Sequence, residues 1–251
     1  MESQLQDELA ARCGLVCLVG AGGKKTTLYR LASAHPGRVG VTSTVYIPLF
    51  PESLEALQVI ADEPALTARV VQAARMVKVV AFARPSGKRG RLAGLLPAQV
   101  AQIHAAAGFD VTLIKADGAR SRWIKAPQTD EPQVPEGANT VIPVVSAHAI
   151  GEPLEERVAH RVDRIAALIG IEPGQIITAE HVAQLLANPQ GALKGTGTAT
   201  VVPLINMVDD RLRKQAAREA AEQALALSKR FDHIVLASMR RSDPLVSVVR
   251  R

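Results

Sequence analysis

Short apolar runs alternate with longer periodic stretches along the chain. A run of β-branched and other apolar residues between turn signals predicts a buried strand, and apolar residues three and four positions apart predict a helix. The predicted strands cover 14–19, 38–45, 77–82, 109–118, 140–145, the segment that opens at 200, 233–238 and a short final stretch at 245–249. The predicted helices cover 2–12, 24–34, 65–75, 97–107, 154–169, 178–187 and 210–228. This alternation predicts an α/β fold in three layers, a mostly parallel sheet with helices on both faces.

The residues that fill these runs are mostly aliphatic. Apolar residues make up 47% of the chain and aromatic residues 3%, so Ala, Val, Leu and Ile have to build the core. This composition is typical of a parallel sheet covered by alanine-rich helices. The length of 251 residues predicts a single domain over 1–251. Pro143 lies inside the strand 140–145 and predicts an edge position or a bulge.

The turn after the first strand carries the most informative pattern. Glycines let backbone N–H groups approach an anion, and a helix that begins there adds unpaired N–H groups and the positive end of its dipole. A lysine at this point reaches the β- and γ-phosphates of a nucleotide, and a threonine hydroxyl ligates Mg²⁺. The turn therefore predicts a phosphate-binding P-loop formed by Gly20, Ala21, Gly22, Gly23, Lys24, Lys25, Thr26 and Thr27.

The strict pattern G-x-x-x-x-G-K-[ST] is only partly met. It would place glycine at Leu18 and a hydroxyl residue at Lys25. We assign Lys24 as the phosphate lysine and Thr26 as the Mg²⁺ ligand, with Lys25 and Thr27 as the alternatives.

Two further predicted strands end in polar residues, and ligands of open α/β sheets bind at the carboxyl ends of strands. Asp117 ends the strand 109–118 and is expected to hold Mg²⁺, while the N–H of Gly118 is expected to contact a γ-phosphate. Thr42 is a candidate γ-phosphate sensor, although a structural threonine in a strand is an equal alternative. The basic residues that follow Asp117 fit either phosphate contacts or a solvated loop; they are Arg120, Arg122 and Lys125.

The strand that opens at Thr200 ends in Asn206-x-x-Asp209. Many GTP-binding P-loop proteins carry Asn-Lys-x-Asp at this place, where the Asp carboxylate accepts from the guanine N1–H and N2–H₂. Asn206 and Asp209 are therefore predicted to read the base. Met207 stands where the lysine of that motif is expected, so the choice between ATP and GTP stays open.

Charge and cysteine content narrow the class of protein. The net charge of +6 fits polyphosphate binding, and nucleic acid is disfavoured because the basic clusters are not interleaved with aromatic residues. Cys13 and Cys17 are the only cysteines in the sequence, too few to indicate a zinc site, and they fit a reduced, cytoplasmic protein. The N-terminal residues lack a secretion signal, and no apolar run is long enough to predict a membrane span.

Taken together, these stretches resemble the YqeC-type selenium-dependent hydroxylase accessory proteins, a family of P-loop proteins. The resemblance is carried in order by 19–27, 41–44, 116–120 with 125–127, and 204–209; Gly151, Pro153-Leu154 and His160-Arg161 also fit. Two positions depart from the family pattern, which has Thr at Lys25 and commonly Lys at Met207. The resemblance implies support for the maturation of selenium-dependent molybdenum hydroxylases, with such a hydroxylase or another maturation factor as the partner.

We therefore expect a P-loop NTPase-like domain that binds ATP or GTP with Mg²⁺ and hydrolyses it slowly. Lys24 would bind phosphates, Thr26 and Asp117 would hold the metal, and Thr42 or Gly118 would sense the γ-phosphate. Two other functions fit the same motifs. One is a small-molecule kinase or transferase, in which the basic residues after Asp117 grip an anionic acceptor. The other is a non-catalytic nucleotide-binding scaffold.

Overall fold

The computed structural model describes residues 2–251, and the side chains from residue 4 onward. Its main sheet has ten strands in the order β14-β13-β12-β9-β1-β7-β2-β5-β4, with β11 paired to β9. The strands are β1 Gly14–Gly20, β2 Val39–Ser43, β4 Leu57–Ile60, β5 Val79–Ala83, β7 Val111–Lys115, β9 Thr140–Ser146, β11 Thr200–Val201, β12 Leu204–Asn206, β13 His233–Ala237 and β14 Leu245–Arg250. Only β14 runs antiparallel to its neighbour, so the prediction of a mostly parallel sheet is confirmed.

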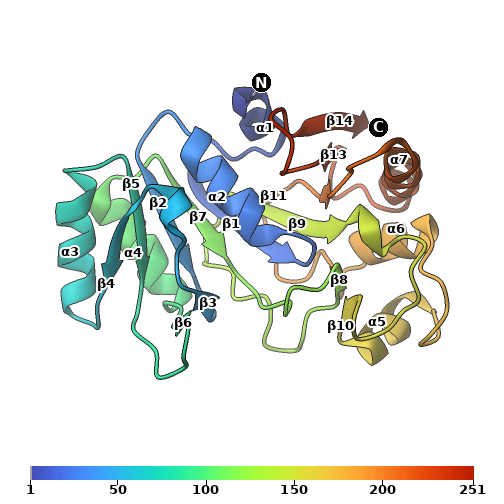
Figure 1. Ribbon diagram of the computed structural model, residues 1–251, viewed down its shortest axis with the longest axis horizontal. Helices are drawn as coiled ribbons and strands as arrows, with labels where there is room; N and C mark the ends of the chain where they lie inside the picture. Colours follow the sequence, from blue (N-terminus) through green and yellow to red (C-terminus); the bar gives the residue numbers. More distant parts are fainter. Residues whose placement is uncertain (1) are drawn as a thin grey trace.

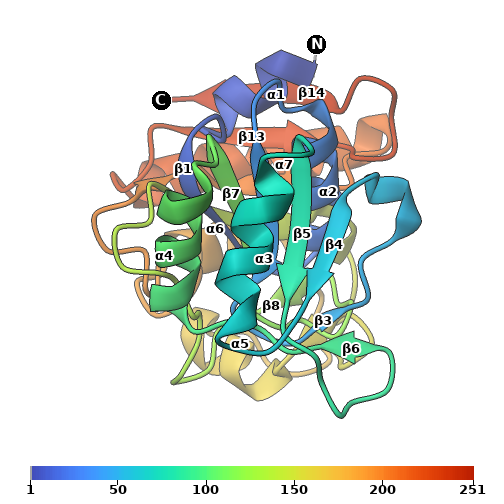
Figure 2. The same cartoon turned by 90° about the vertical axis from the view of Figure 1, so that its left-hand side faces the viewer.

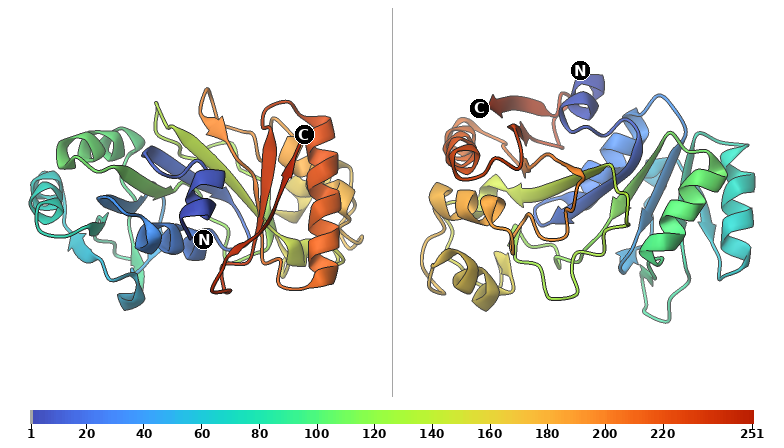
Figure 3. Two further views of the ribbon diagram at one scale, coloured as in Figure 1. Left: turned by 90° about the horizontal axis from the view of Figure 1, so that it is seen from above. Right: turned by 180° about the vertical axis from the view of Figure 1, so that it is seen from behind.

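Helices cover both faces of this sheet (Figure 1). They are α1 Glu2–Glu8, α2 Lys24–Ala34, α3 Ala65–Ala74, α4 Pro97–Ala107, α5 Val162–Ile169, α6 Ala179–Ala187 and α7 Arg211–Leu227. Helices α1 and α2 pack on one face, and the other five lie on the opposite face. From behind, α3 and α4 cover one end of the sheet while α5, α6 and α7 cover the other (Figure 3). The fold is thus the expected three-layer, P-loop NTPase-like α/β arrangement.

Alternation along the central strand explains why both faces are apolar. Val16 and Leu18 of β1 point into the core beneath α2, whereas Cys17 and Val19 point into the core beneath α3 and α4. Successive side chains of a strand point to opposite faces, so a strand covered on both sides must be apolar throughout. In Figure 2, α3 and α4 stand in front of β5 and β7 on one of these faces.

The prediction for Pro143 is wrong, because β9 lies inside the sheet between β1 and β12. Pro143 is paired with Val19 of β1. Its missing N–H falls on the other side, the side on which Val141 accepts a hydrogen bond from Val202 N. The neighbouring segment on that side is interrupted between β11 and β12. No strand residue therefore faces Pro143 there, and its missing N–H costs the sheet no hydrogen bond.

The predicted helix 154–169 is also wrong over its first half. Ala159 and His160 form a short strand, β10, which pairs with β8 (Ile124–Lys125), and α5 begins only at Val162. Arg161 precedes the helix with a φ of 72°, a left-handed conformation. A second small sheet pairs β3 (Ile47–Pro48) with β6 (Arg91–Leu92). Residues 154–158 form bends and a turn rather than a helix. The edge strand β4 was not predicted either.

The carboxyl ends of β1, β7 and β9 meet at one edge of the main sheet. Two short 3₁₀ turns, Glu52–Leu54 and Ala147–Ala149, complete the chain's elements. None of the helices in residues 2–251 combines the length and apolar character that crossing a bilayer requires.

Candidate functional site

The glycine-rich turn between β1 and α2 is fixed by close backbone contacts. Gly20, Gly22 and Gly23 all have positive φ values, 85°, 87° and 109°. A Cβ on Gly20 would lie 2.4 Å from the carbonyl oxygen of Val144, and one on Gly22 would lie 2.4 Å from the nitrogen of Ser146. A Cβ on Gly23 would lie 2.3 Å from the amide nitrogen of Asn206. Only glycine satisfies both the backbone conformation and the space at these positions.

The amides of this turn divide into two groups. Three are occupied by the protein itself: Gly20 N donates to Asp117 Oδ2 at 2.8 Å, Ala21 N to Val144 O at 2.8 Å and Gly22 N to Arg122 O at 2.9 Å. The next four amides, those of residues 23–26, donate no hydrogen bond within the part of the chain that is described. They form the N-terminal end of α2, where unpaired N–H groups and the helix dipole favour an anion.

These amides open onto a cleft of about 720 Å³. Its wall is made by the start of α2, the ends of β1 and β7, the loop 118–123, and the small β3–β6 sheet. Six basic side chains line it, and one acidic side chain, Glu131, accompanies them; the basic ones are Lys24, Lys25, Arg91, Lys115, Arg120 and Arg122. A concave site with this excess of positive charge fits an anionic ligand of the size of a nucleotide.

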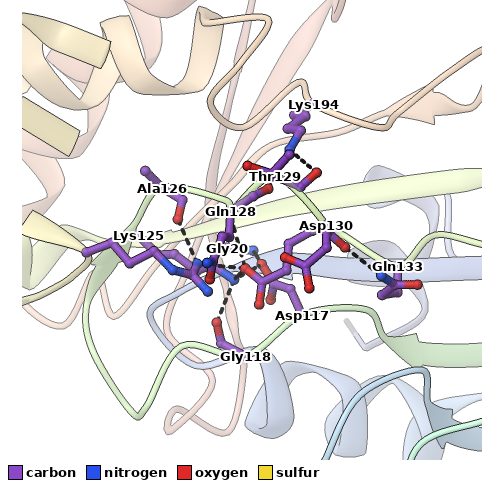
Figure 4. A network of polar contacts seen from close by, with 12 residues as sticks. Gly20, Asp117, Gly118, Lys125, Ala126, Gln128, Thr129, Asp130, Gln133 and Lys194 are labelled. Carbon is purple, nitrogen blue, oxygen red and sulfur yellow. Dashed lines mark hydrogen bonds and ion pairs between the residues drawn. The ribbon is translucent and has the colours of Figure 1, made fainter. Parts of the chain in front are cut away.

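A chain of buried ion pairs lies behind the turn. The ammonium of Lys24 is 2.8 Å from Asp117 Oδ1, and the ammonium of Lys125 is 2.8 Å from Asp117 Oδ2. Lys125 is also 2.6 Å from Glu131 Oε2, which in turn pairs with Arg161 at 2.6 Å. Figure 4 shows Lys125 and Asp117 pointing toward one another beside Gly20, with the Gly118 carbonyl accepting from Lys125.

The charges of this chain follow from its pairing. Burial raises the pKa of Asp117, but the ammonium groups of Lys24 and Lys125 outweigh it and hold the pKa below its usual value. Burial likewise raises the pKa of Glu131, and hydrogen bonds from Arg161 and Lys125 reverse this and lower it to about 2. Both carboxylates are therefore ionised at neutral pH, and Lys125 is buried as their shared cation.

The two residues predicted to hold Mg²⁺ differ in exposure: Thr26 lines the cleft, whereas Asp117 is 1% exposed and does not line it. Thr26 is exposed at the cleft in the first turn of α2, and Asp117 lies at the end of β7. Asp117 Oδ1 accepts no hydrogen bond of good geometry and is held only by the Lys24 charge. Mg²⁺ binds through one or two protein ligands plus substrate phosphates and water, so it does not need a larger cluster. No cluster of three or more His, Cys, Asp or Glu side chains suited to a metal occurs in the described residues.

Two of the predicted hydroxyl groups are already engaged elsewhere. Thr42 is fully buried and donates to Phe82 O at 2.7 Å, so the structure does not bring it to the cleft. Thr27 is also buried, and its hydroxyl donates back to Gly23 O at 3.2 Å, one turn earlier in the helix. Gly118, by contrast, does line the cleft.

Of the two residues predicted to read the base, Asn206 contacts the glycine-rich turn, whereas Asp209 contacts Ser238 and His148. Asn206 is buried at the end of β12, and its side chain donates to Gly22 O at 2.8 Å. Asp209 is partly exposed; it accepts from Ser238 Oγ at 2.6 Å and lies 2.9 Å from His148 Nε2. Burial raises the pKa of Asp209, and these two hydrogen bonds lower it overall. Asn206 thus holds the glycine-rich turn, whereas Asp209 presents an ionised carboxylate.

Sequence reasoning missed Lys115, and it did not single out Arg91 within its basic loop. Lys115 is buried at the end of β7, and its ammonium donates to Tyr46 O at 2.9 Å. Burial, and then the nearby charge of Lys24, lower its pKa to about 7, and Arg91 adds to this effect. Burial also lowers the pKa of Lys25, and Arg91 again contributes. The position of Lys115, two residues before Asp117 at a strand end, was a signal that could have identified it. Nothing in the sequence placed Arg91 in the same cleft.

Comparison with known proteins gives two matches. A family profile described as YqeC protein matches residues 16–163. The chain is 30% identical over 185 residues to an uncharacterized protein, YqeC, from Escherichia coli (strain K12), a match that covers 72% of this chain and 70% of that relative. The profile range contains the glycine-rich turn, Asp117 and the basic loop that follows it.

Proposed function

Because this chain belongs to the YqeC family, whose matched range includes the whole glycine-rich turn, we propose that it is an Mg²⁺-dependent nucleotide-binding protein and a slow nucleoside triphosphatase. ATP and GTP are both candidate ligands. The observation that carries the proposal is the set of four unbonded amides, residues 23–26, that open onto the basic cleft. Backbone amides at a helix N-terminus, beside a lysine, are the arrangement by which proteins hold a polyphosphate.

Lys24 and Asp117 have distinct roles in this proposal. A polyphosphate on the amides of residues 23–26 attracts the ammonium of Lys24 away from Asp117 and Gly20 O, which it contacts now. Lys125 remains to neutralise Asp117, so the carboxylate stays ionised when Lys24 leaves. Thr26 and Asp117 would then hold Mg²⁺, which neutralises charge on the phosphates.

Calorimetric titration of ATP and GTP with Mg²⁺ tests this proposal. Lys24→Ala should weaken triphosphate binding by at least tenfold, because it removes the ammonium assigned to the phosphates. Arg89→Ala is the matched control, since Arg89 is an exposed cation on the neighbouring loop that does not line the cleft. Unchanged triphosphate affinity in Lys24→Ala would refute the phosphate-site assignment.

We further propose that nucleotide turnover serves the maturation of selenium-dependent molybdenum hydroxylases, with a hydroxylase or another maturation factor as the protein partner. The support for this part is the family resemblance carried by residues 19–27, 116–120 and 204–209. The test is complementation: deletion of the gene should abolish selenium-dependent hydroxylase activity, and the native chain, but not Lys24→Ala, should restore it. Full activity in the deletion strain would overturn the proposed role.

A further inference from the structure

Three lysines are buried around the cleft, and one of them lacks a carboxylate partner. Lys24 and Lys125 each form an ion pair with Asp117. Lys115 forms none with any described residue; its ammonium donates to the carbonyl of Tyr46 at 2.9 Å, a single acceptor for three N–H donors. Burying a cation without a counter-ion is costly unless a ligand supplies the missing charge.

The backbone of Lys115 is held on both sides, which fixes the direction of its side chain. Lys115 pairs with Leu18 of β1 and Ser43 of β2, and its carbonyl accepts from Ser43 Oγ at 2.7 Å and from Thr44 N at 3.2 Å. Only 6% of Lys115 is exposed, and yet it lines the cleft. The ammonium is therefore directed into the cleft by a rigid strand rather than by a flexible loop.

Arg91 approaches the same part of the cleft from the small β3–β6 sheet. It pairs with Pro48 across that sheet, and its guanidinium forms no ion pair within the described chain. Tyr46, whose carbonyl binds Lys115, lies on the same wall of the cleft. Lys115 and Arg91 thus line one cleft from different sheets, and neither has a carboxylate partner among the described residues.

We propose that Lys115 and Arg91 form a second anion subsite, which binds the phosphate-like group of an anionic co-substrate while the nucleotide occupies the P-loop. The inference rests on the proposed function, and it deepens it by giving the cleft two ligands. Lys25 also lines this cleft. Lys125 does not take part, because its ammonium is fully engaged by Asp117, Glu131 and Gly118 O.

The same cations could instead contact the terminal phosphate of the nucleotide, and competition separates these two sources. Inorganic phosphate is the anion to titrate, by calorimetry, into protein saturated with Mg²⁺ and a non-hydrolysable triphosphate analogue. Phosphate should bind under these conditions, because the analogue fills the γ-phosphate position and leaves the second subsite open. Loss of phosphate binding upon saturation with the analogue would overturn the proposal.

Two variants and one control assign the subsite to its residues. Lys115→Met and Arg91→Ala should each weaken phosphate binding to the analogue-saturated protein at least tenfold and should weaken binding of the analogue by a smaller factor; Arg89→Ala should change neither. Arg91 is exposed, so its variant tests the subsite even if Lys115→Met does not fold. A larger effect on the analogue than on phosphate would contradict the proposal. If the native chain binds no nucleotide, the proposed function fails. Phosphate binding then still tests the subsite, because Arg91→Ala should weaken it and Lys24→Ala should not.

Discussion

The ammonium of Lys24 lies 2.8 Å from Asp117 Oδ1, and both side chains are almost completely buried. The lysine expected to bind phosphates therefore faces the carboxylate expected to hold the metal. Since Lys125 contacts the other oxygen of the same carboxylate, two cations share one anion behind the P-loop. This arrangement keeps the carboxylate of Asp117 ionised before any ligand arrives.

Asp117→Asn should destabilise the protein strongly. It leaves Lys24 and Lys125 buried without their common counter-ion, and breaking a buried pair by removing one partner costs about 3–5 kcal/mol. Chemical denaturation measures the change in the free energy of unfolding. Asp232→Asn is the control, because Asp232 is exposed and should shift stability by no more than about 0.5 kcal/mol. A stability equal to that of the control would mean that the ion-pair chain contributes nothing.

Nucleotide binding should release the loop 118–123. The carbonyl of Arg122 occupies the amide of Gly22, and both Arg120 and Ser121 have left-handed φ values, 45° and 60°. A phosphate chain that competes for the Gly22 amide would break this contact and relieve the strained backbone. Hydrogen exchange should then slow for the amides of 23–26 and speed up for 119–123 upon addition of Mg²⁺ and triphosphate. Identical exchange in both segments at saturating nucleotide would rule this out.

Asn206 and Asp209 should have separable effects on nucleotide affinity. Asn206→Ala removes the hydrogen bond to Gly22 O and should weaken ATP and GTP binding alike, since the P-loop itself loosens. Asp209→Ala removes a charged acceptor, and hydrogen bonds to charged groups contribute about 1.5–3 kcal/mol, so GTP binding should weaken about tenfold or more while ATP binding is unchanged. Competition titration with both nucleotides measures the ratio. An unaltered GTP-to-ATP ratio in Asp209→Ala would remove this residue from the base site.

Acidification from pH 6.5 toward 4 should destabilise the protein through His160. Burial, together with the charges of Arg161, Lys125 and Arg120, lowers the pKa of His160 from 6.5 to about 4. Between these two pH values the unfolded chain binds a proton at His160 that the folded chain does not. The contribution of His160 to the free energy of unfolding is therefore complete above pH 6.5 and falls as the pH drops toward 4. His160→Gln should flatten this slope in denaturation measured at several pH values.

A second acid transition belongs to Glu131 and lies in a separate range. Its pKa is lowered from 4.5 to about 2, so its contribution to stability is present above 4.5 and is lost between 4.5 and 2. His160→Gln should leave that lower range unchanged. A flat profile between pH 6.5 and 4 in the native chain would contradict the assignment to His160.

The framework of the fold could be predicted from local sequence patterns. The strand 14–19, the glycine-rich turn and the helix 24–34 are local: apolar β-branched residues, glycine freedom and helical spacing all lie within one stretch of chain. Asp117, Gly118 and Asp209 are candidates for a similarly local reason, since each lies within three residues of the end of an apolar strand. Family membership was recognisable from these stretches alone.

The tertiary structure decided which side chains face the cleft and which face each other. Thr42 is buried and its hydroxyl donates to Phe82 O, because the pairing of β2 with β5 and β7 sets the orientation of this side chain. Tertiary contacts also explain Pro143, whose missing N–H falls at a gap in the neighbouring strand. They likewise explain Lys125, which forms ion pairs with Asp117 and Glu131. Lys115 and Arg91 lie 24 positions apart and on different sheets, and only packing brings them to one cleft. Long-range pairing and the balance of buried charge depend on partners far along the chain, and no local pattern encodes them.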